Sequence, residues 1–228
     1  MDTKIIKTLP LSLSGVSAGI MLAAADYHVD WLTALLLVAM TVFVHCFSLT
    51  VKSEDEKERK ASNVFLALII ATGVGMIYSS FGTVLFMMET LLLLVFGYMI
   101  IRAVRHTDFV SRGKGVAYVF VLFGLVAVYG SYYICSHAFG SWPLLFPALS
   151  MGFMALAAKA DDDRALFRNL MVLAGWAAMI VFSCLRMYDP WHFLFVLSLP
   201  LFFMKRRTVA AVFVFAILSG GGFLMYLL

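Results

Sequence analysis

Nine apolar runs, each bounded by charged or turn residues, dominate this chain of 228 residues. They cover residues 8–27, 30–51, 63–80, 83–101, 115–136, 142–158, 169–187, 190–204 and 209–228. A transmembrane helix needs about 20 mostly apolar residues, although about 17 suffice. The chain is 63% hydrophobic and 13% charged, whereas soluble domains are about 45–50% apolar and about 25% charged. The sequence therefore predicts an all-α membrane protein, a single bundle of nine transmembrane helices over residues 1–228.

The basic residues are confined to alternate loops between these runs. Cytoplasmic loops of membrane proteins are rich in Lys and Arg, and external loops are poor in both. With a cytoplasmic N-terminus, every one of the 17 basic residues except Arg186 falls on the cytoplasmic side. Adding or removing one run would reverse every later loop and destroy this separation. The charges thus predict an external C-terminus, and the net charge of +4 suits a plasma (inner) membrane with anionic lipid.

Small residues replace leucine along one side of the first run. Gly15 and Gly19 form a GxxxG pair, and Ser14 and Ala18 form a second small pair one residue earlier. Lipid supplies no hydrophobic force between helices, so helices associate where small residues let their backbones approach. We therefore expect this helix to pack inside the bundle, with Pro10 near its start, where a missing N–H costs little.

Two clusters of acidic residues lie on the predicted cytoplasmic side. One follows the second run and holds Glu54, Asp55, Glu56 and Glu58; the other is Asp161, Asp162 and Asp163, after the sixth run. The spacing alone favours two solvated loops of mixed charge, because such runs are usually solvated. The three cysteines show no CxxC spacing, so neither a disulfide framework nor a zinc site is indicated.

Two longer strings resemble one known family. "KTLPLSLSGVSAGIMLA", residues 7–23, and "VFVLFGLVAVYGSYYICSHAFGSWPLLFPALSMGFMALA", residues 119–157, are similar to segments of the UbiA prenyltransferase superfamily, in particular its 1,4-dihydroxy-2-naphthoate polyprenyltransferases. The resemblance implies nine membrane helices with active-site loops after the second and the sixth. It also implies the transfer of a polyprenyl group from its diphosphate to an aromatic acceptor, with loss of carboxylate, on the pathway to menaquinone.

The resemblance assigns roles to the two acid clusters. Carboxylates of such enzymes hold Mg²⁺, and Mg²⁺ together with basic residues holds the prenyl diphosphate. Carried over to this chain, the metal ligands would be Glu54, Glu58, Asp161, Asp162 and Asp163, and the diphosphate ligands Lys52, Arg164 and Arg168. The chain departs from the family pattern, because residues 45–59 contain no Asn and three consecutive Asp residues point in different directions on a helix.

Two further polar residues lie within the apolar runs. A carboxylate at membrane depth is costly, and Glu89 in the fourth run therefore marks either a functional group or a protonated contact between helices. His45 lies one turn or more before the first acid cluster and could face a cavity, although a single histidine more often makes a satisfied polar contact.

Three functions stay open at this point. The first is a divergent prenyltransferase that acts on a polyprenyl diphosphate and an aromatic acceptor with Mg²⁺ in the lipid bilayer. The second is an inactive paralogue that binds an isoprenoid or quinone, or serves as a scaffold for a membrane-protein partner. The third, a small transporter, is disfavoured because the helix number is odd and no internal repeat is visible. No nucleic-acid partner is expected.

Overall fold

The computed structural model describes residues 3–51, 55–79, 117, 119–160, 164–186, 190–202 and 208–219. All secondary structure in these ranges is helical. The elements are α1 (Thr3–Asp26), α2 (Trp31–Thr50), α3 (Glu56–Ser79), the π-helical segment η2 (Val121–Val126), α6 (Ala127–Ser136), the 3₁₀ turn η3 (Trp142–Leu144), α7 (Leu145–Lys159), α8 (Ala165–Leu185), the 3₁₀ segment η5 (Pro190–Ser198), α9 (Leu199–Phe202) and α10 (Thr208–Ser219).

These helices confirm an all-helical fold with apolar segments suited to a membrane. Five are long and apolar enough to span a bilayer, namely Thr8–Asp26, Trp31–Thr50, Glu56–Tyr78, Trp142–Lys159 and Ala165–Leu185. Three shorter apolar helices cover Val121–Ser136, Phe193–Phe202 and Val209–Ser219. Eight of the nine expected runs thus overlap a described helix. The remaining one, the fourth run at 83–101 with Glu89, lies outside the described residues. The total of nine spans and their orientation stay predictions.

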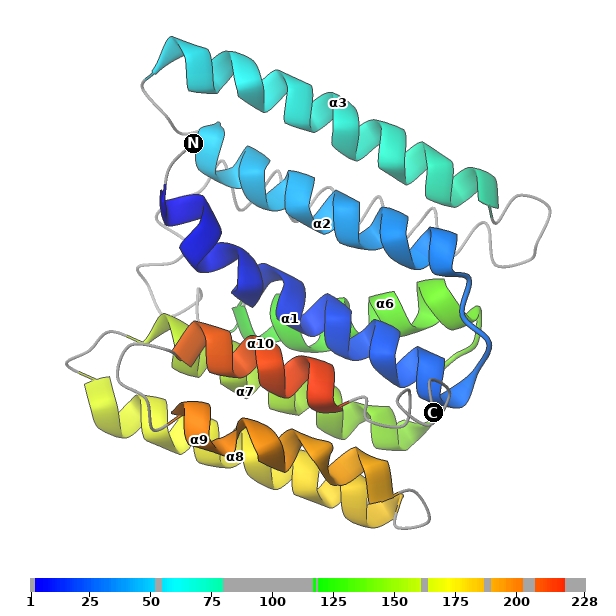
Figure 1. Ribbon diagram of the computed structural model, residues 1–228, viewed down its shortest axis with the longest axis vertical. Helices are drawn as coiled ribbons and strands as arrows, with labels where there is room; N and C mark the ends of the chain where they lie inside the picture. Colours follow the sequence, from blue (N-terminus) through cyan, green and yellow to red (C-terminus); the bar gives the residue numbers. More distant parts are fainter. Residues whose placement is uncertain are drawn as a thin grey trace.

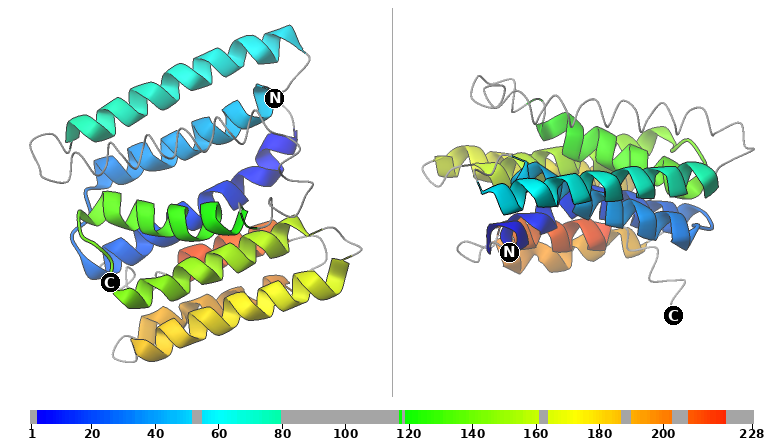
Figure 2. Two further views of the ribbon diagram at one scale, coloured as in Figure 1. Left: turned by 180° about the vertical axis from the view of Figure 1, so that it is seen from behind. Right: turned by 90° about the horizontal axis from the view of Figure 1, so that it is seen from above.

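The helices lie side by side with their axes roughly parallel or antiparallel (Figure 1). Seen from above, α6 and α7 form one layer, while α1, α10 and the η5–α9 segment lie beneath it (Figure 2). We call one end of the bundle the charged end; there α2 stops at Thr50, α3 begins at Glu56, α7 stops at Lys159 and α8 begins at Ala165. The opposite end, where α1 stops at Asp26 and α2 begins at Trp31, is the aromatic end.

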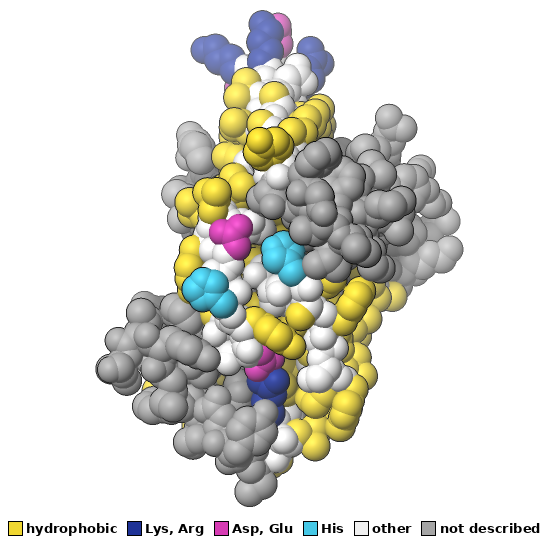
Figure 3. All heavy atoms as spheres, turned by 90° about the vertical axis from the view of Figure 1, so that its right-hand side faces the viewer, with side chains coloured by type: hydrophobic (Ala, Val, Ile, Leu, Met, Phe, Trp, Pro, Cys, Tyr) yellow, Lys and Arg dark blue, Asp and Glu magenta, His cyan; other side chains and the backbone are white. Residues whose placement is uncertain are grey.

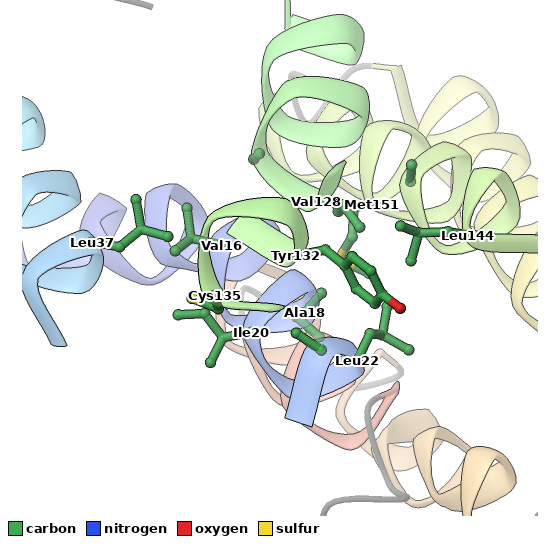
Figure 4. Packing of buried hydrophobic residues seen from close by; sticks show 14 of the residues in the cluster. Val16, Ala18, Ile20, Leu22, Leu37, Val128, Tyr132, Cys135, Leu144 and Met151 are labelled. Atoms are coloured by element: carbon green, nitrogen blue, oxygen red, sulfur yellow. The ribbon is translucent and has the colours of Figure 1, made fainter. Parts of the chain in front are cut away.

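Helix α1 is the centre of this arrangement and packs against α2, α6, α7 and α10. Its glycines make this possible: a β-carbon at Gly15 would clash with the carbonyl oxygen of Phe123, and one at Gly19 with the carbonyl oxygen of Val128. The backbones of α1, η2 and α6 therefore touch, as the small-residue pattern predicted. Around this contact Tyr132 of α6 lies among Ala18, Leu22 and Met151, with Leu37 of α2 on the other side (Figure 4).

The second family-like string forms a similar contact between η2 and α7. A β-carbon at Gly124 would clash with the carbonyl oxygen of Ala148, and one at Gly152 with the ring of Phe120. The hydroxyl of Ser150 then joins α7 to α8 by donating to the carbonyl oxygen of Gly175 at 2.7 Å. Both strings thus form the close-packed interior of the bundle.

One detail of the first helix differs from expectation. Pro10 lies inside α1 and not at its start, because the helix begins at Thr3. The helix can continue through Pro10 because a proline costs one backbone hydrogen bond, and neighbouring groups of a membrane bundle can satisfy the freed carbonyl.

The remaining helices close the two edges of the bundle. An aromatic cluster of Trp176, Phe195, Phe202 and Phe215 joins α8, η5, α9 and α10, with ring centroids 5.0 to 6.3 Å apart. At the opposite edge α3 packs on α2 and leaves Val64, Ile70, Val74 and Tyr78 exposed. An exposed apolar face of this length suits contact with lipid.

Candidate functional site

The helix ends that flank the two acid clusters lie at the same end of the bundle. Figure 1 shows the end of α2, the start of α3, the end of α7 and the start of α8 all at the charged end. Helices α3 and α8 lie at opposite edges of the bundle, however, with α1, α2 and α10 between them. Of the predicted ligands, Lys52, Glu54, Asp161, Asp162 and Asp163 lie outside the described residues, while Glu58, Arg164 and Arg168 lie within them.

Two described acids of the first cluster have local structural roles. The Asp55 carboxylate accepts a hydrogen bond from the Lys57 backbone N–H at 2.9 Å and so caps the start of α3. Glu56 forms an exposed ion pair with Lys60, one turn later, at 2.8 Å. Glu58 lies in the same first turn of α3 and is half-buried. In the described part of this cluster, the contacts are those of a solvated helix start.

Basic side chains flank the second acid cluster on both sides. Arg164 is exposed just before α8, and Arg168 is half-buried one turn further along, so both lie on the same side of the helix. On the other side, the ammonium of Lys159 at the end of α7 lies 5.2 Å from the centre of the Phe123 ring. Sequence reasoning counted Lys159 only as a loop charge; its position directly after an apolar run was the available signal.

The chemistry of the predicted ligands fits Mg²⁺, which prefers oxygen donors such as carboxylates. Among the described residues, no group of three or more His, Cys, Asp and Glu side chains converges on a common point. Any such group would have to include residues outside the described ranges, such as Glu54 or Asp161 to Asp163. The metal site therefore stays a prediction, supported by residue type and by the shared end of the bundle.

His45 makes the satisfied polar contact that the sequence left as one possibility. It is buried on α2, and its Nδ1 lies 2.8 Å from the Ser12 hydroxyl while its Nε2 lies 3.1 Å from the Thr8 hydroxyl. Thr8 and Ser12 lie one turn apart on α1, on either side of Pro10. We call these three residues the His45 cluster; it joins α1 and α2 near the charged end.

A second polar cluster, which sequence reasoning missed, lies at the aromatic end. The Nη1 and Nη2 atoms of Arg186 donate to Oδ1 and Oδ2 of Asp26 at 2.5 and 2.9 Å, and the Tyr132 hydroxyl donates to Oδ2 at 2.7 Å. Only 13% of the Arg186 side chain and 18% of the Asp26 side chain are exposed. We call Asp26, Tyr132 and Arg186 the aromatic-end clamp, because they join α1, α6 and the end of α8.

Large, exposed aromatic side chains lie at the same end of the bundle as this clamp. Tyr27, Trp31, Phe139 and Trp142 are each 46% exposed or more, and such residues concentrate at membrane interfaces.

The same end also holds the cap of α2. The Asp30 carboxylate accepts hydrogen bonds from the backbone N–H of Leu32 and from the Thr33 hydroxyl. The Thr33 hydrogen bond holds the pKa of Asp30 below its ordinary value. Figure 3 looks onto this end, where acidic, histidine and basic side chains lie among apolar ones.

These features define a class: a multi-pass helical membrane protein with a close-packed interior and polar groups at the two ends of its helices. One comparison gives a more particular likeness. The chain is 24% identical over 255 residues to the 1,4-dihydroxy-2-naphthoate octaprenyltransferase of Escherichia coli (strain K12), an alignment that covers 89% of this chain and 82% of that protein. No protein-family model matches the chain, and no solved structure matches it significantly.

Proposed function

We propose that this protein is a divergent prenyltransferase of the UbiA type, which transfers a polyprenyl group to 1,4-dihydroxy-2-naphthoate or a similar aromatic acceptor. The observation that carries the proposal is the distant similarity to a naphthoate octaprenyltransferase along 89% of the chain. A second observation supports it: α2 stops, α3 begins, α7 stops and α8 begins at the same end of the bundle. In this proposal the charged end faces the cytoplasm and the membrane is the plasma membrane.

In the proposed reaction the bond between the prenyl C1 carbon and the diphosphate breaks, and a ring carbon of the acceptor bonds to C1. The acceptor carboxylate leaves as CO₂, and the diphosphate leaves as an anion. Arg164 and Arg168 at the start of α8, Lys159 at the end of α7, and Lys52 would together hold the diphosphate. The carboxylates of Glu54, Glu58 and Asp161 to Asp163 would hold Mg²⁺, which neutralises diphosphate charge when bound. The apolar interior keeps water from the reactive prenyl group.

A second function has an observation in its favour. Asp55 and Glu56 already cap and pair at the start of α3, and α3 and α8 stand at opposite edges of the bundle. An inactive relative that binds an isoprenoid or quinone in the membrane, with or without a membrane-protein partner, needs no convergence of the two acid clusters. Nothing in the described fold favours the small transporter.

One assay separates the two functions. Purified protein in detergent is incubated with Mg²⁺, farnesyl diphosphate and 1,4-dihydroxy-2-naphthoate, and the prenylated product is measured by mass spectrometry. The prenyltransferase should form product and should lose at least about a hundredfold in rate when Asp161, Asp162 and Asp163 are all changed to Asn, as expected for removal of metal ligands.

The matched control changes two acids that have local partners. The D55N/E56Q variant removes the same kind of charge from the same end of the bundle and should keep most of the activity. No product from the unchanged protein, despite measurable binding of farnesyl diphosphate, would favour the inactive relative. Equal loss in both variants would show that overall charge, and not the second acid cluster, matters.

A further inference from the structure

The α2–α3 hairpin, residues 31–79, occupies one edge of the bundle and carries the first acid cluster. Helix α3 packs on α2 and is exposed along most of its length, while α2 in turn packs on α1 and α6. The position of the start of α3 therefore depends on how α2 is held against α1. In lipid, apolar contacts between helices gain little from the hydrophobic effect, so polar contacts weigh more in fixing geometry.

The His45 cluster provides such a polar contact between α1 and α2 near the charged end. His45 lies five residues before Thr50, the last residue of α2, which is about 7.5 Å along the helix axis. Both of its ring nitrogens are engaged, with Ser12 at 2.8 Å and Thr8 at 3.1 Å. Because the two hydroxyls lie one turn apart on α1, the ring is held at two points, which fixes both the sliding and the rotation of α2 on α1.

We propose that His45 is a positioning residue, which uses Thr8 and Ser12 to hold the end of α2 and the start of α3 at a set distance from the start of α8. The proposal adds to the proposed function by naming what sets the spacing of the helix ends that flank the two acid clusters. The consequence for ligand binding rests on that function, whereas the consequence for geometry does not.

The geometric test measures the distance between the two edges of the charged end. Asn63 on α3 and Asn169 on α8 are both exposed and near the starts of their helices. Each is changed to Cys and spin-labelled in a C184S background, because Cys184 is exposed whereas Cys46 and Cys135 are buried. The distance distribution is then measured by pulsed electron paramagnetic resonance in detergent.

The expected result is one narrow distribution in the parent protein and a broader or shifted one in H45L. H45Q should restore the narrow distribution, because an amide can donate and accept as the imidazole does. S48A is the matched control, since the Ser48 hydroxyl on the same helix donates only to the His45 carbonyl of its own backbone among the contacts described, at 2.8 Å. If H45L does not fold, the T8V/S12A variant removes both partners and leaves α2 unchanged.

A second readout links the geometry to the proposed site. Mg²⁺-dependent binding of farnesyl diphosphate should weaken about fivefold in H45L, the scale of one interhelical hydrogen bond, and recover in H45Q. An unchanged distance distribution in both H45L and T8V/S12A would overturn the inference, whatever the binding shows. If the distribution responds but the parent protein binds no farnesyl diphosphate, the positioning role stands and the proposed function fails.

Discussion

The two ends of the bundle use the same kinds of polar residue in different ways. At the aromatic end, the partners of Asp26 come from two other helices: Tyr132 lies 106 positions away in the chain and Arg186 lies 160 positions away. At the charged end, Asp55 and Glu56 find their partners two and four residues away. Long-range contacts hold helices together, whereas local ones only start a helix. The contrast is therefore between the aromatic-end clamp, which joins three helices, and the described acids Asp55 and Glu56, which stay near solvent at the start of one helix.

The largest effect should come from breaking the aromatic-end clamp. R186A leaves the Asp26 carboxylate mostly buried without its cation, and removal of one partner from a buried ion pair costs about 3–5 kcal/mol. Because both side chains are partly exposed, we expect about 2–3 kcal/mol, seen as a lower midpoint of thermal unfolding in detergent.

The clamp also predicts how much stability each of its side chains contributes. Y132F removes one hydrogen bond to Asp26 and should cost about 1 kcal/mol. The D26A/R186A double variant should lose less than the sum of the two single variants, because the two residues share one interaction. Strictly additive losses would show that the pair contributes little to the fold.

A middle-sized effect is expected at the cap of α2. D30A removes the side chain that accepts from Leu32 and Thr33 and should lower the free energy of unfolding by about 1 kcal/mol near neutral pH. The pKa of Asp30 is lowered in the folded protein by the Thr33 hydrogen bond. Its stabilisation is therefore present above the ordinary pKa of about 3.9 and is lost as the pH falls further.

This sign can be checked by comparing the parent protein and D30A at pH 6 and at pH 3. The difference in unfolding midpoint should be present at pH 6 and smaller at pH 3. A difference that grows with acid would mean that the cap acts through its protonated form.

The smallest effect should come from the exposed pair at the charged end. E56Q removes the partner of Lys60, and exposed pairs one helical turn apart contribute about 0.3–0.5 kcal/mol. The midpoint of thermal unfolding should therefore fall only slightly at low ionic strength, far less than in R186A, and the difference should vanish in high salt. A loss as large as that of R186A would remove the contrast between the two ends.

Sequence reasoning found the parts of the fold that depend on local patterns. The apolar runs and the small residues of the first helix predicted where helices lie and that Gly15 and Gly19 face other backbones, because both depend on spacing within one segment. Sequence reasoning did not explain Arg186, the one basic residue that falls on the predicted external side. Its partner Asp26 lies 160 positions away, and nothing local links the two.

The candidate site was harder to predict for a related reason. Acidic residues beside basic ones occur both in cation sites and in solvated loops, and only their contacts separate the two. For Asp55 and Glu56 those contacts are local, while Lys52, Glu54 and Asp161 to Asp163 stay predictions. The partners of His45 could not be identified either, because the face of α1 that meets α2 depends on how the whole bundle packs.

The aromatic-end clamp also bears on how the protein is made. A ribosome adds Asp26 160 residues before Arg186, so α1 reaches the membrane long before the cation that binds Asp26. Folding during synthesis proceeds from the N-terminus. Helix α1 must therefore keep a provisional arrangement until the end of α8 arrives and fixes it.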